Sequence, residues 1–300
     1  TRLTLQQLKY VVTVARTGSM SEASKELFIS QPGLTTSIRE LETEMGIKIF
    51  TRTNKGVVTS NEGERFLGYA RQVLEQASLL EGVYKSGTKI KQQFCVSTQH
   101  YSFAVNAFVD LIRRFAGEEY DFSLRETETY EIIDDVAKMK SEIGILYLNS
   151  FNKDALMKII KSKLLTFTEL FTAKPHVFVS TDHPLADKKS VTMEELADYP
   201  YLSFEQGEHN SFYYSEEIFS TVGRTKNIRV TDRATLFNLL IGLNGYTVCS
   251  GVIDNELNGD NITAIPLDEE GNMKIGYIEN KKILHSNLAE AYIEALKKHI

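Results

Sequence analysis

The stretch that decides the fold, residues 19–52, reads SMSEASKELFISQPGLTTSIRELETEMGIKIFTR. Ser19 and Glu22 have the spacing of a capping box, which predicts the start of a first short helix. The apolar stripe of that helix is expected at Ala23, Leu27 and Phe28. A second helix and a basic, β-prone segment follow within the same stretch. Two short helices and a β segment in this order are typical of a winged helix-turn-helix.

The second helix has its own start and stop signals. Ser30 is a suitable N-cap, and Pro32 falls in the first turn, where its missing N–H costs nothing. Gly46 suits a C-terminal cap with positive φ. Four apolar residues at helical spacing lie between these signals, namely Leu34, Ile38, Leu41 and Met45. The pattern predicts an amphipathic helix between Ser30 and Gly46.

In a helix-turn-helix, the second helix lies in the DNA major groove and leads with its N-terminal residues. The candidates for DNA contact on this helix are Gln31, Pro32, Thr35, Thr36, Ser37 and Arg39. Arg52 and Lys55 flank a predicted turn at the wing tip and are expected to contact phosphates or enter a minor groove. The alternatives are a helical hairpin that touches no DNA and a wing whose charges are merely solvated.

The charge of the chain is unevenly distributed. A net charge of −6 over 300 residues by itself argues against a nucleic-acid partner. Residues 1–60, however, hold eight Lys and Arg against five Glu, a net +3, which leaves −9 on the rest. A basic module on an acidic body is the expected electrostatic footprint of a protein that docks only one face onto DNA.

The stretch from Leu5 to Gly63 resembles the DNA-binding domain of LysR-type transcriptional regulators. The residues that carry the resemblance are Gly18, Ser19, Met20, Ala23, Leu27, Gln31, Pro32, Ile38, Leu41, Glu42, Gly46, Phe50, Arg52 and Gly63. Thr36 stands at a position that is often basic in that family, so the preferred DNA sequence cannot be copied from relatives. The resemblance implies a sequence-specific regulator that binds double-stranded promoter DNA.

Length and composition bound the remaining possibilities. With 300 residues, 42% of them hydrophobic, the chain is expected to form about two globular domains. No apolar run reaches membrane-spanning length and no apolar signal segment opens the sequence, so a cytoplasmic protein without a membrane partner is expected. Cys95 and Cys249 lie far apart in apolar runs and are interpreted as reduced core thiols, with a redox switch left open.

Residues 59 to about 86 read as one long helix that starts at Thr59 or Ser60. Its broad apolar stripe consists of Phe66, Leu67, Ala70, Val73, Leu74, Ala77, Leu80 and Tyr84. A helix roughly 40 Å long is too long for a small domain to cover, so an antiparallel copy from a second subunit is expected. The resemblance implies the same dimer, and a dimer of dimers is expected from it. Packing against its own chain alone is the alternative.

From residue 92 onward, predicted strands and helices alternate, which indicates parallel sheets with helices on their faces. Strands are predicted at 94–98, 122–125, 143–148, 177–179, 201–204, 228–231, 246–249 and 274–278. Helices are predicted at about 102–116, 131–140, 193–198, 211–222, 233–243 and 287–299. The fold class is therefore α/β, and the resemblance implies a two-lobed effector-binding domain similar to periplasmic solute-binding proteins.

The predicted domain boundaries follow from these patterns and from the resemblance. A winged helix-turn-helix domain is expected at 1–60, a linker and dimerisation helix with a hinge at 61–90, and the effector-binding domain at 91–300. Within the last, lobe I is expected at about 91–165 and 271–300, and lobe II at about 166–270.

A ligand cleft is expected between the lobes, because open α/β sheets bind ligands at the carboxyl ends of their strands. Thr98, Gln99 and His100 follow the first strand and precede a helix, an arrangement that suits an anion or carboxylate. Further candidates for effector contact are Tyr147, Ser203, Glu205 and Thr247. Since Glu205 could pair with an amino group, an anionic or amino-acid-like metabolite is expected. Local cap or turn hydrogen bonds are the alternative role for each residue.

An enzyme is the competing class of function. The sequence has no nucleophile elbow, phosphate-binding loop, dinucleotide fingerprint or metal-binding His pair, so no catalytic residue, cofactor or metal is expected. A plain solute-binding protein is the other alternative, and the helix-turn-helix opposes it. The sequence thus predicts a regulator whose promoter binding responds to a small metabolite, with contact to RNA polymerase left open.

Overall fold

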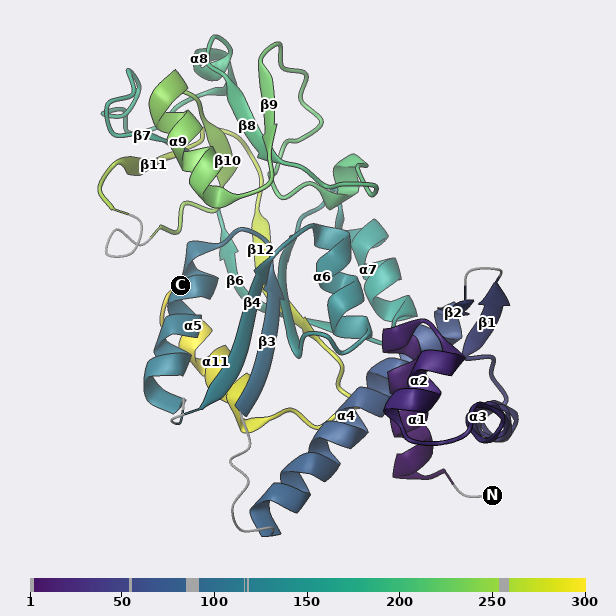
Figure 1. The fold of residues 1–300 in the computed structure, drawn as a ribbon. Helices are drawn as coiled ribbons and strands as arrows, with labels where there is room; N and C mark the ends of the chain where they lie inside the picture. Colours follow the sequence, from purple (N-terminus) through teal and green to yellow (C-terminus); the bar gives the residue numbers. More distant parts are fainter. Residues whose placement is uncertain (1–2, 54–55, 85–91, 116, 118, 254–258) are drawn as a thin grey trace. The chain divides into compact units, whose positions relative to one another are not determined.

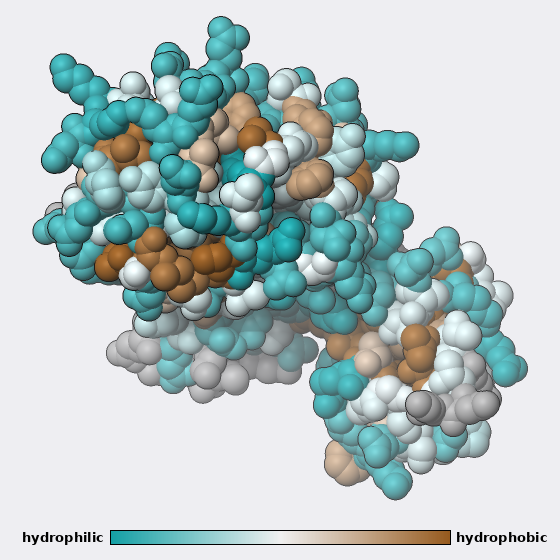
Figure 2. Space-filling view, turned by 90° about the horizontal axis from the view of Figure 1, so that it is seen from above, coloured by the Kyte–Doolittle hydropathy of each residue, from teal (hydrophilic) through white to brown (hydrophobic). Residues whose placement is uncertain are grey.

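The computed structural model describes residues 3–53, 56–84, 92–115, 117, 119–253 and 259–300. The chain forms two compact units, one of Thr1–Lys91 with Ala137–Lys140 and one of Gln92–Val136 with Ser141–Ile300. The surface in Figure 2 is largely hydrophilic, with scattered apolar side chains. Within the described ranges, we find no helix with the length and apolar character needed to cross a bilayer.

The first unit contains a helical core and a β-hairpin (Figure 1). Its elements are α1 (Leu5–Thr17), α2 (Met20–Glu26), α3 (Gln31–Met45), β1 (Phe50–Thr53), β2 (Gly56–Thr59) and α4 (Asn61–Tyr84). The Ser19 and Ser30 side chains accept the backbone N–H groups of Glu22 and Gly33, so both capping predictions are confirmed. The winged helix-turn-helix is thus present, and its core includes Val11, Ala23, Leu34, Leu41 and Leu67.

One detail of the first unit differs from the sequence interpretation, and another decides between two predicted helix starts. Phe28 is 94% exposed and has φ 54°, because the chain reverses in a left-handed turn after α2 and carries this side chain off the apolar stripe. Its assignment to that stripe is wrong. Ser60, rather than Thr59, caps α4 by accepting the Gly63 N–H at 2.9 Å.

Gly63 allows α4 to approach the wing closely. A Cβ atom at this position would lie 2.3 Å from the carbonyl oxygen of Ile49, whose neighbour Phe50 begins β1. Any side chain would push the first turn of α4 away from the strand. The glycine therefore fixes the distance between the helix and the hairpin.

The second unit contains a five-stranded sheet with the order β4-β3-β5-β12-β6. The strands are β3 (Gln92–Thr98), β4 (Tyr120–Glu126), β5 (Ile143–Leu148), β6 (Thr166–Ala173) and β12 (Met273–Glu279). Strands β4, β3 and β5 run parallel, whereas β12 runs antiparallel to β5 and β6. Strand β6 belongs to this sheet, although the predicted lobe II begins near residue 166.

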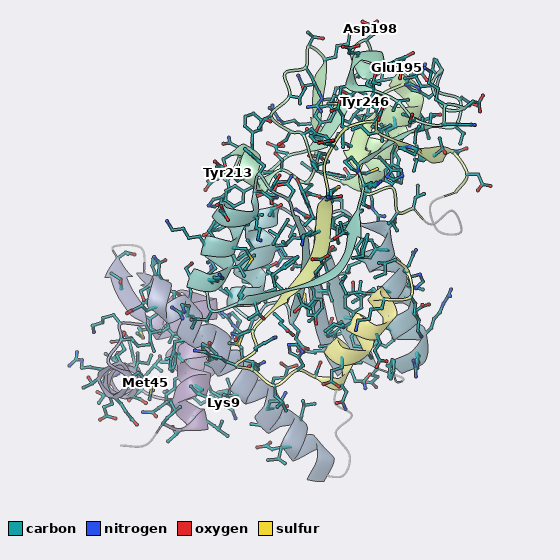
Figure 3. All side chains as sticks on the ribbon, turned by 180° about the vertical axis from the view of Figure 1, so that it is seen from behind. Lys9, Met45, Glu195, Asp198, Tyr213 and Tyr246 are labelled. Atoms are coloured by element: carbon teal, nitrogen blue, oxygen red, sulfur yellow. The ribbon has the colours of Figure 1, made fainter. Side chains whose placement is uncertain are left out.

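Helices cover both faces of this sheet, and side chains fill the space between the layers (Figures 1 and 3). Helices α5 (Ser102–Phe115) and α11 (Asn287–Leu296) lie on one face. Helices α6 (Thr129–Ala137) and α7 (Lys153–Ser162) lie on the other. The sequence interpretation did not include α7 or β6.

The chain between β6 and β12 forms a second, smaller α/β lobe. Its elements are β7 (His176–Ser180), α8 (Met193–Leu196), β8 (Tyr201–Phe204), η1 (Phe212–Tyr214), β9 (Asn227–Val230), α9 (Arg233–Leu243), β10 (Thr247–Cys249) and β11 (Ile262–Pro266). Strands β10-β7-β11 form an antiparallel sheet, and β8-β9 form a parallel pair. An isolated bridge between Tyr201 and Tyr246 connects β8 to the segment before β10.

The predicted helix at 211–222 is wrong. The structure has only the 3-10 turn η1 there, followed by irregular backbone with a left-handed Phe219. Two glutamates of this segment turn inward: Glu216 accepts the His100 N–H, and Glu217 accepts the Phe204 N–H. Hydrogen bonds between these side chains and distant backbone groups hold the segment in place, instead of the helical hydrogen bonds that the sequence predicts.

Candidate functional site

Helix α3 presents its predicted contact residues on its outer face. Gln31, Pro32, Thr36 and Arg39 are exposed, whereas Thr35 and Ser37 are half-buried. Leu34 and Ile38 between them are buried in the core, so the apolar stripe fixes which side chains face outward. Short polar groups at the start of an exposed, capped helix are suited to approach base edges and phosphates.

The wing is a two-stranded antiparallel hairpin in which Arg52 pairs with Val57. Arg52 lies in β1, but its side chain and all of Lys55 lie outside the described part of the chain. The hairpin is joined to α3 through Glu42, whose carboxylate accepts the backbone N–H groups of Ile49 and Phe50 at 2.8 and 3.1 Å. The recognition helix and the wing therefore share a buried polar anchor.

The Glu42 carboxylate is stabilised in its charged form. Burial alone would raise its pKa, but hydrogen bonds from Lys48, Phe50 and Ile49 outweigh burial and hold the pKa of Glu42 below its usual value. Lys48 Nζ lies 2.8 Å from Glu42 Oε2.

A second candidate site is a small cavity between the five-stranded sheet and the smaller lobe. Its volume is about 40 Å³, which is room for a few water molecules. The polar side chains around it include His100, Glu216, Glu217, Arg233 and Thr247. The aromatic side chains around it are Tyr101, Phe178, Phe204 and Phe237. Charged groups within an aromatic wall are typical of a ligand site.

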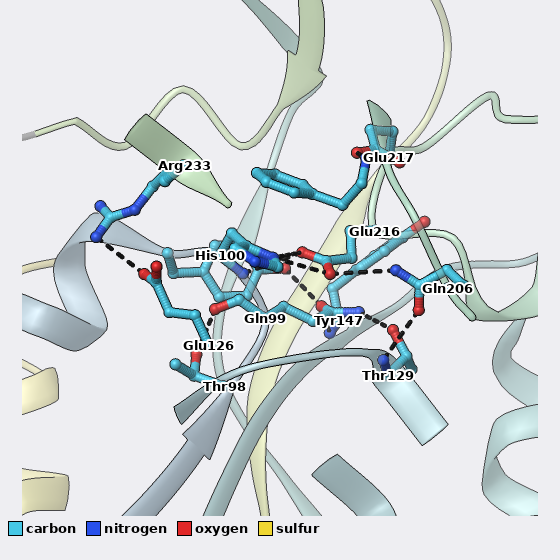
Figure 4. Close-up of polar contacts among 12 residues, drawn as sticks. Thr98, Gln99, His100, Glu126, Thr129, Tyr147, Gln206, Glu216, Glu217 and Arg233 are labelled. Atoms are coloured by element: carbon cyan, nitrogen blue, oxygen red, sulfur yellow. Dashed lines mark hydrogen bonds and ion pairs between the residues drawn. The ribbon is translucent and has the colours of Figure 1, made fainter. Parts of the chain in front are cut away.

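His100 joins the two lobes at this cavity (Figure 4). Its backbone N–H donates to Glu216 Oε2 at 3.0 Å, and its Nδ1 lies 2.9 Å from the same oxygen. Its ring stacks on Phe204 with 3.7 Å between the centroids. Burial alone would lower the pKa of His100, but the Glu216 carboxylate, helped by Glu126 and Glu217, holds that pKa above its usual value. The imidazolium form is favoured.

A chain of hydrogen bonds continues from Glu216 into the sheet (Figure 4). Gln206 Nε2 donates to Glu216 Oε1 at 3.2 Å, and Gln206 Oε1 accepts the Thr129 N–H at 2.9 Å. Gln99 Nε2 in turn donates to Thr129 Oγ1 at 2.7 Å, and Gln99 Oε1 accepts the Tyr147 N–H at 3.0 Å. The network links the two lobes. Each polar group in this chain from Glu216 to Tyr147 has a hydrogen-bond partner, which stabilises the present arrangement of the lobes.

Two further carboxylates flank His100. Burial, followed by the neighbouring Glu216 charge, raises the pKa of Glu217 to about 8, so this group is mostly neutral at pH 7. Glu126 Oε1 pairs with Arg233 Nη2 at 2.9 Å. Burial raises the pKa of Glu126 despite the opposing effect of Arg233. The charged or ionisable side chains of the cavity wall are thus His100, Arg233, Glu216 and the mostly neutral Glu217, and Glu126 pairs with Arg233 from outside the wall.

The seven predicted effector residues do not share one cavity. His100 and Thr247 line the small cavity, whereas Ser203 and Glu205 line a separate pocket of about 380 Å³ on the smaller lobe. The other three lie beneath the cavity as buried groups: Thr98, Gln99 and Tyr147. The Thr98 hydroxyl donates to the Gln99 carbonyl, as the local-hydrogen-bond alternative expects.

Sequence reasoning missed most of the cavity wall, including Phe204, Glu216, Glu217 and Arg233. Only Arg233 had a usable signal, because Asp232 before it caps α9 and places it in the first helical turn near the strand ends. Glu216 and Glu217 read as the polar face of a predicted helix, and nothing in their neighbours indicates burial.

Potential metal ligands and cysteine thiols are two further features of the described residues. Among the residues that the structure describes, no group of three or more His, Cys, Asp or Glu side chains is placed to hold a metal ion. Cys95 and Cys249 are both free thiols. Burial raises the pKa of the Cys249 thiol, which disfavours the reactive thiolate.

Comparison with known families gives two matches on this chain. The family described as "Bacterial regulatory helix-turn-helix protein, lysR family" matches residues 5–64. The family described as "LysR substrate binding domain" matches residues 96–300. Together these matches cover the helix-turn-helix unit and nearly all of the α/β unit.

Comparison with individual proteins gives more distant matches. The chain is 29% identical over 205 residues to the uncharacterized regulator YnfL of Escherichia coli, covering 67% of this chain and 65% of YnfL. It is 29% identical over 207 residues to the uncharacterized regulator YybE of Bacillus subtilis, covering 67% of this chain and 66% of YybE. The match thus spans slightly less than two thirds of both relatives. Full-length OxyR from Pseudomonas aeruginosa, a point mutant, has a similar fold, with TM-score 0.64, 19% identity and coverage of 99% and 98% of the two chains.

Proposed function

Because the chain belongs to the LysR family of bacterial helix-turn-helix regulators, we propose that it binds promoter DNA and that a small metabolite modulates this binding. The family consists of transcription regulators rather than enzymes, and a protein that acts on bacterial DNA works in the cytoplasm. The observation that carries the proposal is the capped helix α3. It exposes Gln31, Pro32 and Thr36 to solvent, while its opposite face packs into the core of the first unit.

DNA recognition is assigned to α3 and the wing. Gln31, Thr35, Thr36 and Ser37 carry short hydrogen-bonding groups, and Arg39 adds an exposed cation on the same helix. Such groups can read base edges in the major groove, while Arg52 and Lys55 contact phosphates or a minor groove. The net +3 charge of residues 1–60 supports docking through this unit.

A dimer through α4 would place two recognition helices on two half-sites. In its C-terminal half α4 exposes apolar side chains that a second copy could cover: Val73 is 45% exposed and Leu80 is 61% exposed. A dimer of dimers and a contact with RNA polymerase complete the proposed assembly.

The effector is proposed to be anionic or amino-acid-like and to bind between the lobes. Two cations, His100 and Arg233, reach the cavity from opposite lobes and support an acidic ligand. A ligand that changes the angle between the lobes would change the spacing of recognition helices across the dimers. The ligand would act by stabilising one of two arrangements of the lobes. Its effect on the free energy of DNA binding would equal the difference between its binding free energies for these two arrangements.

Selection of bound fragments from a genomic DNA pool tests the proposal. The full chain, at near-physiological salt, should enrich fragments that share an inverted repeat, because two half-sites face a two-fold dimer. The matched control carries Gln31→Ala and Thr35→Ala, which remove two contact groups from the surface of α3 and should abolish the enrichment. No enrichment by the folded, dimeric wild type would refute DNA recognition by this chain.

A further inference from the structure

The Glu216 carboxylate occupies an anion site at the start of α5. It accepts the His100 N–H at 3.0 Å two residues before the helix begins, and Gln206 Nε2 donates to it at 3.2 Å. His100 Nδ1 lies 2.9 Å away as a third partner. A backbone N–H, an imidazolium and an amide at a helix N-terminus are the donors that a free carboxylate would be expected to use. Here the chain supplies that carboxylate itself.

Further donors at the same cavity have no partner. His100 Nε2, which is a donor when the ring is protonated, is buried, and so are Nε and Nη1 of Arg233. The described residues accept no hydrogen bond from any of these atoms. Both side chains line the cavity beside Glu216. Buried donors are rarely left unpaired, because each costs free energy until an acceptor reaches it. These atoms are available to donate to an acceptor bound in the cavity.

While Glu216 stays in place, the donors that it occupies are closed to another acceptor, and the space beside it is small. The volume of the cavity is about 40 Å³, and Glu216 is only 7% exposed. The segment 215–226 that carries Glu216 contains no helix or strand, so its side chain can leave without breaking a ladder of backbone hydrogen bonds. Glu217 next to it is held separately by the Phe204 N–H at 2.8 Å.

We propose that Glu216 is a built-in carboxylate that fills the effector's own anion subsite, and that the effector is a small carboxylic acid which displaces it. The acid would take over the His100 N–H and imidazolium and extend toward Arg233. The charge near His100 is unchanged by this exchange, because one carboxylate replaces another. Glu216 would move to solvent and release its link between the lobes. This inference rests on the proposed function, since it assigns the ligand class and the regulation of the same site.

The test removes the internal carboxylate and supplies a free one. In the full chain, Glu216→Ala should bind acetate, measured by calorimetry and by the rise in melting temperature. Acetamide, which has nearly the same shape without the charge, should bind about tenfold more weakly or worse. Wild type should bind acetate about tenfold more weakly than the variant, because Glu216 competes. Glu208→Ala, which removes an exposed glutamate from the same lobe, should behave as wild type.

A second variant keeps the shape of the site in case Glu216→Ala does not fold. Glu216→Gln retains the side-chain volume but removes the charge, so the His100 pKa, followed by NMR, should fall and acetate affinity should exceed that of wild type. Equal binding of acetate and acetamide by the variants, or equal acetate binding by variant and wild type, would overturn the proposal. Fragment selection without acetate separates the two hypotheses. If the protein enriches DNA fragments but the variants do not prefer acetate to acetamide, only the proposal of an internal carboxylate is overturned. If the variants prefer acetate but the protein enriches no fragments, only DNA recognition is overturned.

Discussion

Glu42 near the end of α3 accepts the backbone N–H of Ile49, just before the wing, at 2.8 Å. Glu42 is only 8% exposed, so this bond lies in the core of the first unit. The same carboxylate reaches the next N–H along the chain and the Lys48 ammonium. A single buried charge thus holds the end of one helix against the first residues of the hairpin.

Replacement of Glu42 by glutamine should destabilise the first unit. Glu42→Gln keeps one acceptor but loses the charge, and a hydrogen bond to a charged group contributes about 1.5–3 kcal/mol. We expect the free energy of unfolding to fall by about 2 kcal/mol in urea denaturation of the full chain, in the transition of the first unit. Glu40→Ala on the same helix is the control, because Glu40 is exposed. Equal stability of the two variants would contradict the anchor.

The same variant predicts a pH dependence. The pKa of Glu42 is held below its ordinary value of 4.5, so the carboxylate stabilises the folded state above that pH. This contribution is lost as the pH falls through the lowered pKa of the folded state. The stability difference between wild type and Glu42→Gln should therefore be constant at neutral pH and shrink in acid. A difference that is independent of pH down to acid unfolding would rule out this role.

Glu217 should produce the opposite dependence in the α/β unit. Its pKa rises from 4.5 to about 8 on folding, so the folded state binds the proton more tightly. Stability should therefore decline as the pH rises between these values, by up to about 1.4 kcal/mol per pH unit, and then level off. Glu217→Gln should remove this part of the slope in thermal unfolding measured across that range. His100, whose raised pKa acts in the same direction, is left in place, so the difference reports Glu217.

The exposed apolar side chains near the C-terminal end of α4 predict which substitution would weaken the proposed dimer. Leu80 is 61% exposed within one chain, and an aspartate there would place a charge in the proposed helix–helix interface. Leu80→Asp should raise the dimer dissociation constant about tenfold to a hundredfold, since burying one leucine contributes about 1.5–3 kcal/mol. Sedimentation velocity measures the change. Ser78→Asp, also exposed but on another face, should leave the dimer intact; a dimer unaffected by Leu80→Asp would place the interface elsewhere.

Local signals in the sequence predicted the fold of the first unit well. Ser30 and Gly46 mark the ends of α3 because caps depend on a few neighbouring residues and on one φ angle, here 66° at Gly46. Phe28 failed because a left-handed turn redirected an apolar side chain that spacing alone assigns to the helix. The role of Glu42 as an anchor required knowing that the wing folds back onto α3.

The cavity was harder to predict because its walls come from distant parts of the chain. His100 and Glu216 are 116 residues apart, and their contact depends on how two lobes meet. Thr98 and Gln99 were expected to contact the ligand, but they are buried outside the cavity lining, where their side chains bond to neighbouring backbone and side-chain groups. Nothing in the sequence indicates that charged residues on an apparent helix face are buried. Only the tertiary structure shows this burial.

Arg39 should contribute to DNA affinity by contacting a phosphate group rather than by reading a base. It is exposed on α3, where the outer face of the helix meets the DNA in the proposed complex. Loss of one phosphate contact lowers the slope of log affinity against log salt by about 1, and weakens binding to all sequences alike. Arg39→Ala should show both effects in fluorescence titrations on a selected fragment and on an unrelated duplex. Arg16→Ala is the control, because Arg16 lies on α1 in an ion pair with Glu26 and should leave the slope unchanged. A slope unaltered by Arg39→Ala would remove this residue from the interface, whereas a loss confined to the selected fragment would make it a base contact.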